Sequence, residues 1–414
     1  MKLPFFKSRA SDAPAGSTPV ANILVSQSAY DSRDPSTIVA QNAAFVNGLL
    51  TQGAYLRDEL PADAMRSYHV DYYLAQVSNG GHGQLVGNSR WQPFIVKDIA
   101  EGLEAMRAQP FDVIFRDLCR LMASDSARAE RIAKSGGFGE KDPAIAELDE
   151  RYFAQDAHKI ITPANDRWLR SLPELKVVPN AEYAAALQTL CNANPDRAAR
   201  LAAREREGMA ARLVDPVRVA TRLLCMKANC LPILAFGGGD PVAIAPDGRQ
   251  GVGWQIQSRA GRQIVFLFND FAYLCETYLV DGRKLTPELM AEQRQHLLSR
   301  DLTGLEAFSK LSHKEIARIP GAHVAGAIEA AKQMPIIRFA ELLCAKMKPA
   351  TNFRDVYAAT LHNSGQFLWL METESSIGLF GFNNDNLVLF DLQMKPLAMI
   401  SREDVAATQR ATKL

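Results

Sequence analysis

The chain has 414 residues, which is too long for one ordinary domain, so we expect two or three domains. Apolar residues make up 47% of the chain and charged residues 22%, a composition typical of proteins that form hydrophobic cores. The formal net charge of +1 excludes a strong charge field that would draw the whole chain to nucleic acid or to a membrane surface.

Residues 1–35 are rich in Ala, Ser, Pro and Asp and predict a flexible lead, although VANILVSQ is apolar enough to dock against the body. The N-terminus lacks the apolar run of about 7–15 residues that forms the core of a signal peptide. No run approaches the ~18 apolar residues of a membrane span. We therefore expect a cytoplasmic protein without a membrane partner.

Residues 36–175 predict an all-α domain, with no confident strand before residue 176. Ser36 is the expected N-cap of the first helix, because apolar residues follow it with helical periodicity. A second helix, over 61–79, is expected to stop at Asn79-Gly80-Gly81, since glycine adopts the left-handed conformation at little cost. Further helices are predicted over 93–108, 111–124 and 143–156.

Residues 176–235 predict a helical connector. Its segment NPDRAARLAAREREGMAARL mixes acids with the arginines and contains no aromatic residue. This pattern favours a solvated helix with side-chain ion pairs over a helix that binds nucleic acid. Direct binding of nucleic acid is therefore not expected.

Residues 236–414 predict an α+β domain with a small antiparallel sheet, so the fold class of the whole chain is α+β. FGGGDP at 236–241 is interpreted as a turn, and two strands are expected to meet at Arg259–Gly261. Residues 285–347 are predicted to be helical. Near the C-terminus a strand meander is expected, with turns at Glu374–Ser376, Asn383–Asn386 and Met394–Pro396.

The usual motifs of cofactor, metal and nucleophile sites are missing. FGGGDP has neither the P-loop spacing nor the dinucleotide-binding spacing. The seven histidines form no HExxH or HxH pair, and Cys225 and Cys230 have no second pair of ligands nearby. No GxSxG sequence occurs. We expect no cofactor and no metal, and reduced cysteines that act as small apolar residues.

The most distinctive stretch is NGGHGQ at 79–84. Three interpretations stay open: a polar clamp that fixes a turn between helices, a binding surface, and a catalytic site with His82 as acid or base. Gln84 and Asn88 lie four residues apart, so they share a face if a helix restarts after Gly83. No carboxylate in the local sequence partners His82.

YYLAQVSNGGHGQLVGNS resembles the helix-NGG-x-x-Q-x-x-x-N signature of the DNA-mimic-protein-like domain, a bacterial family long catalogued as a domain of unknown function. AIAELDERYFAQD, at 144–156, is similar to the later LDERFY segment of that family, and the order and separation of the two elements agree. AAFVNGLLTQG stands where the family has its first helix. The resemblance covers about residues 36–175, and the residues that match its motifs are Asn79, Gly80, Gly81, Gln84, Asn88, Asp149, Glu150 and Arg151.

The activity after which the family is named is imitation of DNA by a strongly acidic, dimeric surface that occupies a transcription regulator. Residues 31–170 carry 20 acids and 16 Lys and Arg, a net charge of −4. Duplex DNA carries one charge per ~1.7 Å of its axis, so the negative charge here is far weaker. Leu85 and Val86 also stand where the family has an aromatic residue.

The resemblance implies a non-catalytic protein that binds a protein partner, a transcription regulator or a toxin, through its helical domain. It also makes a homodimer an expectation. The alternative is an enzyme of unrecognised type, with a site at the 79–88 turn or between the domains. In that case His82 would need a carboxylate from elsewhere in the chain.

Overall fold

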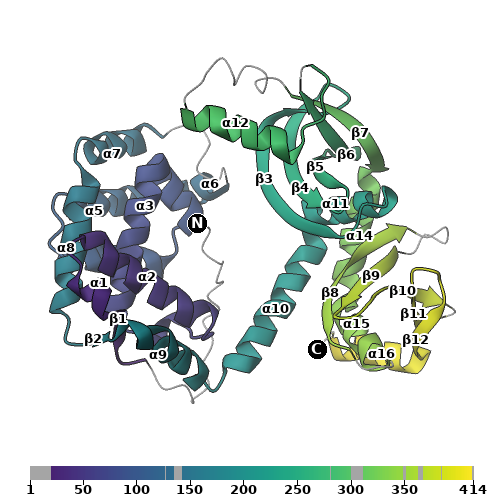
Figure 1. Cartoon of the computed structure of the whole chain (residues 1–414), viewed down its shortest axis with the longest axis horizontal. Coiled ribbons are helices and arrows are strands. Elements are labelled where there is room, and N and C mark those ends of the chain that lie inside the picture. Colours follow the sequence, from purple (N-terminus) through teal and green to yellow (C-terminus); the bar gives the residue numbers. More distant parts are fainter. Residues whose placement is uncertain are drawn as a thin grey trace. The chain divides into compact units, whose positions relative to one another are not determined.

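The computed structural model describes residues 20–125, 127–134, 142–279, 281–299, 311–347, 351–361, 367–383 and 385–412. The chain forms two compact units, unit 1 (Met1–Ala202) and unit 2 (Ala203–Leu414) (Figure 1). The division falls within one helix, α10 (Arg197–Val214). The segment 176–235, predicted to be a separate connector, is thus shared between the two units. No helix in the described part of the chain is long and apolar enough to cross a membrane.

Unit 1 is built mainly from helices, as the sequence predicts. Asp34, and not Ser36, is the N-cap of the first long helix, because its side chain accepts a hydrogen bond from the Ser36 backbone N–H at 2.9 Å and Pro35 occupies the first helical position. The elements are β1 (Ile23–Ser26), α1 (Gln27–Asp31), α2 (Pro35–Thr51), a 3-10 helix (Arg57–Glu59), α3 (Ala62–Ser89), α4 (Pro93–Ala105), α5 (Phe111–Ser124), α6 (Arg128–Lys134), α7 (Pro143–Phe153), α8 (Ala157–Ser171), β2 (Leu175–Val178) and α9 (Asn180–Ala193).

The prediction of no strand before residue 176 is wrong, and so is that of a flexible lead for residues 20–34, where VANILVSQ docks against the body as the alternative allowed. These residues form β1 and α1 instead of a flexible lead, and β1 pairs in parallel with β2 from Ile23↔Leu175 to Ser26↔Val178. Ile23 and Val25 are fully buried. A four-residue strand shows too little periodicity to be recognised, and its partner lies far along the chain. Residues 1–19, the rest of the predicted lead, lie outside the described residues.

The long helix α3 lies among the other helices of unit 1 and contacts α2, α4, α7 and α8 (Figure 1). Its buried Tyr73 packs edge-on against Phe115 of α5 and Tyr152 of α7. Full burial of each such side chain contributes about 1.5–3 kcal/mol. The packing of α3 therefore positions the motif residues Asn79, Gly80, Gly81, Gln84 and Asn88, and its contact with α7 brings the second motif element beside them.

Unit 2 contains two five-stranded antiparallel sheets in which neighbouring strands are consecutive along the chain. The first sheet has the order β3-β4-β5-β6-β7 and the second β8-β9-β10-β11-β12. Its elements after α10 are α11 (Pro216–Lys227), β3 (Ile233–Ile244), β4 (Gln250–Ser258), β5 (Gly261–Leu267), β6 (Phe271–Leu279), α12 (Pro287–Ser299), β7 (Leu311–Pro320), α14 (Gly321–Gln333), α15 (Ile336–Ala345), β8 (Phe353–Leu361), β9 (Phe367–Thr373), β10 (Ile377–Asn383), β11 (Asn386–Phe390), β12 (Pro396–Ile400) and α16 (Arg402–Thr412).

The two halves of unit 2 repeat one topology. A helix precedes each sheet, α11 or α15, and a helix follows it, α14 or α16. FLFND at 266–270 ends the third strand of the first sheet, and FGFNND at 380–385 ends the third strand of the second. No fixed-period repeat is visible in the two sequences.

The α+β class is confirmed, and so are the predicted strand turns. β4 and β5 meet around Arg259–Gly261, and the three turns of the C-terminal meander join β9 to β10, β10 to β11, and β11 to β12. The sheet region is larger than the single small sheet that the sequence predicts.

Two local predictions in unit 2 are wrong. FGGGDP is not a turn: it lies inside β3 and pairs with β4 through register shifts that absorb extra residues. A Cβ on Gly239 would lie 2.6 Å from Val252 Cγ1, so this glycine permits a close approach of the two strands. β7 falls in the span predicted to be helical, because this edge strand exposes most of its side chains and shows no clear alternation.

Candidate functional site

The motif glycines form a kink that divides α3 into two helical segments. Gly80 has φ −161° and ψ 27°, and Gly81 has φ 73° and ψ −177°. The second pair of angles is nearly restricted to glycine. A Cβ on Gly81 would also lie 2.4 Å from Asp149 Oδ2. The helix thus breaks where the sequence predicts, but it resumes at once and not after Gly83.

The carboxylate of Asp149, on α7, closes this kink. Its Oδ1 accepts one hydrogen bond from the backbone N–H of His82 at 2.8 Å and a second from His82 Nδ1 at 2.6 Å. An ionised carboxylate only accepts hydrogen bonds, which assigns the ring proton to Nδ1. The other ring nitrogen, Nε2, lies 3.3 Å from the hydroxyl of Tyr73, which donates to it when the ring is neutral.

The imidazole of His82 is enclosed by aromatic rings. Its exposed fraction is 0%, and the ring centroids of Tyr73 and Tyr152 lie 5.9 Å and 5.7 Å away. Burial raises the pKa of Tyr152 to about 12 and holds the pKa of Tyr73 well above its ordinary value, with further contributions at Tyr73 from Tyr152 and Asp149. His82 has the distant carboxylate that the catalytic interpretation requires, but no surface on which a substrate could contact it. The geometry is that of a clasp between two helices.

The other charged residues of the LDERYF element lie away from the glycine kink. Arg151 pairs with Asp117 of α5 at 2.8 Å, which ties α7 to α5. The side chain of Ser78 on α3 lies 3.2 Å from the hydroxyl of Tyr152. Glu150 is exposed on the outer side of α7. Of the three predicted residues in this element, only Asp149 contacts the glycine kink.

The motif carboxamides form a chain of hydrogen bonds along α3. Asn79 donates to Gln84 Oε1 at 3.0 Å, and Gln84 donates to Gln76 Oε1 at 3.1 Å. Asn88 donates to the same Gln76 oxygen at 2.6 Å. Gln76 joins both helical segments, although it belongs to no sequence motif. Its spacing of eight and twelve residues from Gln84 and Asn88 is the signal in the sequence that indicates this role.

This part of α3 presents an uncharged surface. Residues 72–89 contain no Asp, Glu, Lys or Arg. We define the carboxamide face as Gln76, Asn79, Gln84 and Asn88 together with the exposed residues Ala75, Ser78 and Gly80. Asn79 and Asn88 are themselves exposed. The motif therefore has a buried side, at His82, and an outer side that is available for contact.

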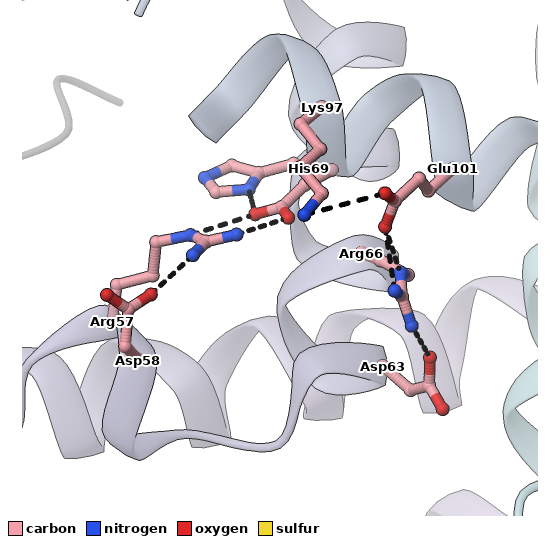
Figure 2. A network of polar contacts seen from close by, with 8 residues as sticks. Arg57, Asp58, Asp63, Arg66, His69, Lys97 and Glu101 are labelled. Carbon is pink, nitrogen blue, oxygen red and sulfur yellow. Dashed lines mark hydrogen bonds and ion pairs between the residues drawn. The ribbon is translucent and has the colours of Figure 1, made fainter. Parts of the chain in front are cut away.

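A second buried histidine–carboxylate pair lies on α3 and α4 (Figure 2). His69 Nδ1 lies 2.7 Å from Asp98 Oδ2, and both residues are 3% exposed. Arg57 donates to both oxygens of Asp98, at 3.2 Å and 2.5 Å. Burial raises the pKa of Asp98, but the hydrogen bonds from His69 and Arg57 outweigh it and hold that pKa below its ordinary value. The sequence offered no motif for this pair.

Further ion pairs on α3 and α4 lie near the His69–Asp98 pair, closer to solvent. Figure 2 shows Arg66 between Asp63 and Glu101. The two ion-pair distances are 2.6 Å and 2.7 Å, and Lys97 Nζ lies 3.7 Å from Glu101 Oε1. These contacts hold α3 against α4. Asp58, Asp63, Asp98 and Glu101 are thus each paired with a basic side chain.

Ion pairing extends to most acids of the helical region. The acids that pair with a basic side chain include Asp58, Glu59, Asp63, Asp98, Glu101, Asp112, Asp117, Asp125, Asp142, Asp156 and Asp166. Pairing of this kind weakens the negative field that the acids would otherwise produce together. Within the described residues, no group of three or more His, Cys, Asp or Glu is arranged to hold a metal ion.

Comparison with known families agrees with the sequence motifs. Residues 58–172 match the family described as DMP19-like protein, which confirms the resemblance to the DNA-mimic-protein-like domain. The matched range runs from the 3-10 helix to the end of α8 and contains both the His82–Asp149 and the His69–Asp98 pair. No curated protein and no solved structure matches the chain.

Proposed function

We propose that this protein is non-catalytic and that it binds another protein through the carboxamide face of α3. The single observation that carries the proposal is the exposed, uncharged carboxamide face around the kink, held by a buried clasp. The family description points to a DNA-binding protein, such as a transcription regulator, as the class of partner. A toxin is the second class of partner that this function would suit.

The chemistry of the carboxamide face suits a protein interface. Charged residues are depleted at the cores of such interfaces, and each carboxamide both donates and accepts hydrogen bonds. Asn88 donates one Nδ2 hydrogen to Gln76 Oε1. Its Oδ1 and its second Nδ2 hydrogen have no partner among the described residues, so both are free to meet a partner.

The clasp supports the proposal because it fixes the shape of this face before binding. Gly81 and His82 are held by Asp149, so the two segments of α3 keep one relative direction. A preformed surface loses less conformational entropy when it binds. Because most nearby acids are paired, we expect recognition by shape and hydrogen bonds, with only a weak dependence on salt.

Affinity capture with the full chain tests the proposal. Asn88→Lys places a charge in the carboxamide face and removes one hydrogen bond to Gln76. Asn192→Lys is the matched control. Asn192 is exposed on α9, which packs against α2 and β1, and its Oδ1 accepts a hydrogen bond from Gln188 Nε2 at 2.9 Å. Circular dichroism checks that both variants fold.

We expect the wild type and Asn192→Lys to retain the same stoichiometric partner from a native lysate, and Asn88→Lys to lose it. A wild type without any stoichiometric partner, or an Asn88→Lys variant that captures as well as wild type, contradicts the proposal. The homodimer stays a prediction, and light scattering of the same wild-type preparation measures its mass.

A further inference from the structure

Unit 2 contains a hollow lined by arginines. Arg212 at the end of α10, Arg218 and Arg222 on α11, and Asp355 and Tyr357 on β8 surround it. The hollow is shallow and partly open to solvent, so a ligand would lie at its open mouth. All of these residues belong to unit 2 and none to the helical region that matches a known family.

The charges around the hollow are unbalanced. Asp355 pairs with Arg212 at 3.1 Å. Within the described part of the chain, no carboxylate lies within ion-pair distance of Arg218 or Arg222, although both are half-buried. The Nε of Arg212 is buried and has no hydrogen-bond partner there. The lining therefore carries two more positive charges than negative ones.

Aromatic rings hold the two unpaired guanidinium groups in place. Arg222 lies 3.9 Å from the ring centroid of Tyr357, and Arg218 lies 4.5 Å from that of Phe236. The hydroxyl of Tyr357 donates to Glu372 at 2.5 Å, which fixes the ring beneath Arg222. Stacking satisfies the faces of the guanidinium groups and leaves their N–H edges free to donate.

We propose that this hollow binds a small anion with a phosphate group. Fixed guanidinium groups donate paired hydrogen bonds to phosphate oxygens, and a phosphate offers oxygens in several directions, as donors on two elements require. A carboxylate has only two oxygens and matches a single arginine. The site is independent of the protein-binding function proposed for unit 1.

Isothermal titration of the full chain with inorganic pyrophosphate and inorganic phosphate tests the proposal. Ionic strength is held constant, and sodium sulfate serves as a control for a general effect of anions. Arg222→Gln removes one donor group, and Arg222→Lys keeps the charge but loses the planar fork. Arg402→Gln is the matched control, because Arg402 is an exposed arginine of unit 2 at the start of α16.

We expect pyrophosphate to bind the wild type and Arg402→Gln equally. Arg222→Gln should bind about tenfold more weakly, the loss expected for one charge-assisted hydrogen-bonding group. Arg222→Lys should also be weakened, while its thermal unfolding stays that of wild type.

Three results would overturn the proposal. The first is no heat of binding with either probe at millimolar concentration. The second is equal binding by sulfate and by pyrophosphate with no effect of Arg222→Gln, which indicates general screening. The third is binding of a single-stranded oligonucleotide in the absence of pyrophosphate binding, which assigns the arginines to a nucleic-acid backbone.

Discussion

Asp149 of α7 accepts two hydrogen bonds from His82 of α3, one from the backbone N–H and one from the imidazole. The two residues are 67 positions apart and belong to the two motif elements that the sequence shares with the DMP19-like family. Their contact explains the motif as one physical unit. The glycines let the α3 backbone turn beneath the carboxylate, and the carboxylate holds the turn.

Gly81→Ala is expected to destabilise unit 1 by about 3 kcal/mol, because alanine is strained at φ 73° and its Cβ would displace a carboxylate that is held by two hydrogen bonds. Urea unfolding, followed by the helical circular-dichroism signal, measures the change.

The neighbouring glycine provides the control for that substitution. Gly80 has φ −161°, which any residue adopts, and the three atoms nearest to a Cβ there all belong to the Gln84 side chain. The Gln84 carboxamide can shift at the cost of its hydrogen bonds to Asn79 and Gln76. Gly80→Ala should cost less than about 1 kcal/mol. Equal losses at the two positions would show that the close approach of Asp149 does not explain the glycines.

Asp149→Ala should destabilise the protein by about 2 kcal/mol, because it leaves two donors of His82 without an acceptor in a buried site. Glu150→Ala, at the exposed neighbouring position, should change the free energy of unfolding by no more than about 0.5 kcal/mol. Hydrogen exchange of the α3 amides should accelerate only in Asp149→Ala. Unchanged exchange near His82 in that variant would argue against the clasp.

The stability contributed by Asp98 should depend on pH in one direction. Its folded pKa lies below the ordinary value of about 3.9, so the contribution is fully present above that value and is lost as pH falls through the lowered pKa. We expect Asp98→Asn to be less stable than wild type at pH 7. The difference should shrink below about pH 4, where the Asp98 carboxylate of the unfolded wild-type chain begins to gain a proton while that of the folded chain stays ionised.

Urea unfolding of wild type and Asp98→Asn at several pH values between neutral and acid measures this difference. Glu104→Gln, which neutralises an exposed acid of α4, is the control and should show little difference at any pH. If the wild-type advantage over Asp98→Asn grew on acidification, the hydrogen bonds from His69 and Arg57 would not be the cause of the lowered pKa.

Local signals predict local structure well in this chain. Gly80 and Gly81 mark the break in α3, and the turns at 383–386 and 394–396 join the expected strands. Glycine and turn residues act through the backbone of their own neighbours, so their effect is visible in a short window of sequence. FGGGDP shows the limit, because inside β3 a tertiary partner strand decides the outcome.

Contacts between distant residues were beyond the reach of the sequence. His82 shows no carboxylate nearby in the chain, yet Asp149 reaches it once α3 and α7 pack together. His69, Asp98 and Arg57 belong to no motif and meet only in the fold. The unit 2 hollow likewise joins arginines of α10 and α11 to Asp355 and Tyr357 of β8, more than 130 positions along the chain. The family resemblance placed both elements of the clasp but not the bond between them.

Site-specific photocrosslinking from position 88 in living cells tests most directly whether the carboxamide face is a binding surface. A photoreactive amino acid replaces Asn88 in one variant and Asn192, on α9, in the control. The account predicts one cross-linked product of defined mass from position 88 and none of that mass from position 192. No product from position 88, or the same product from both positions, would contradict it.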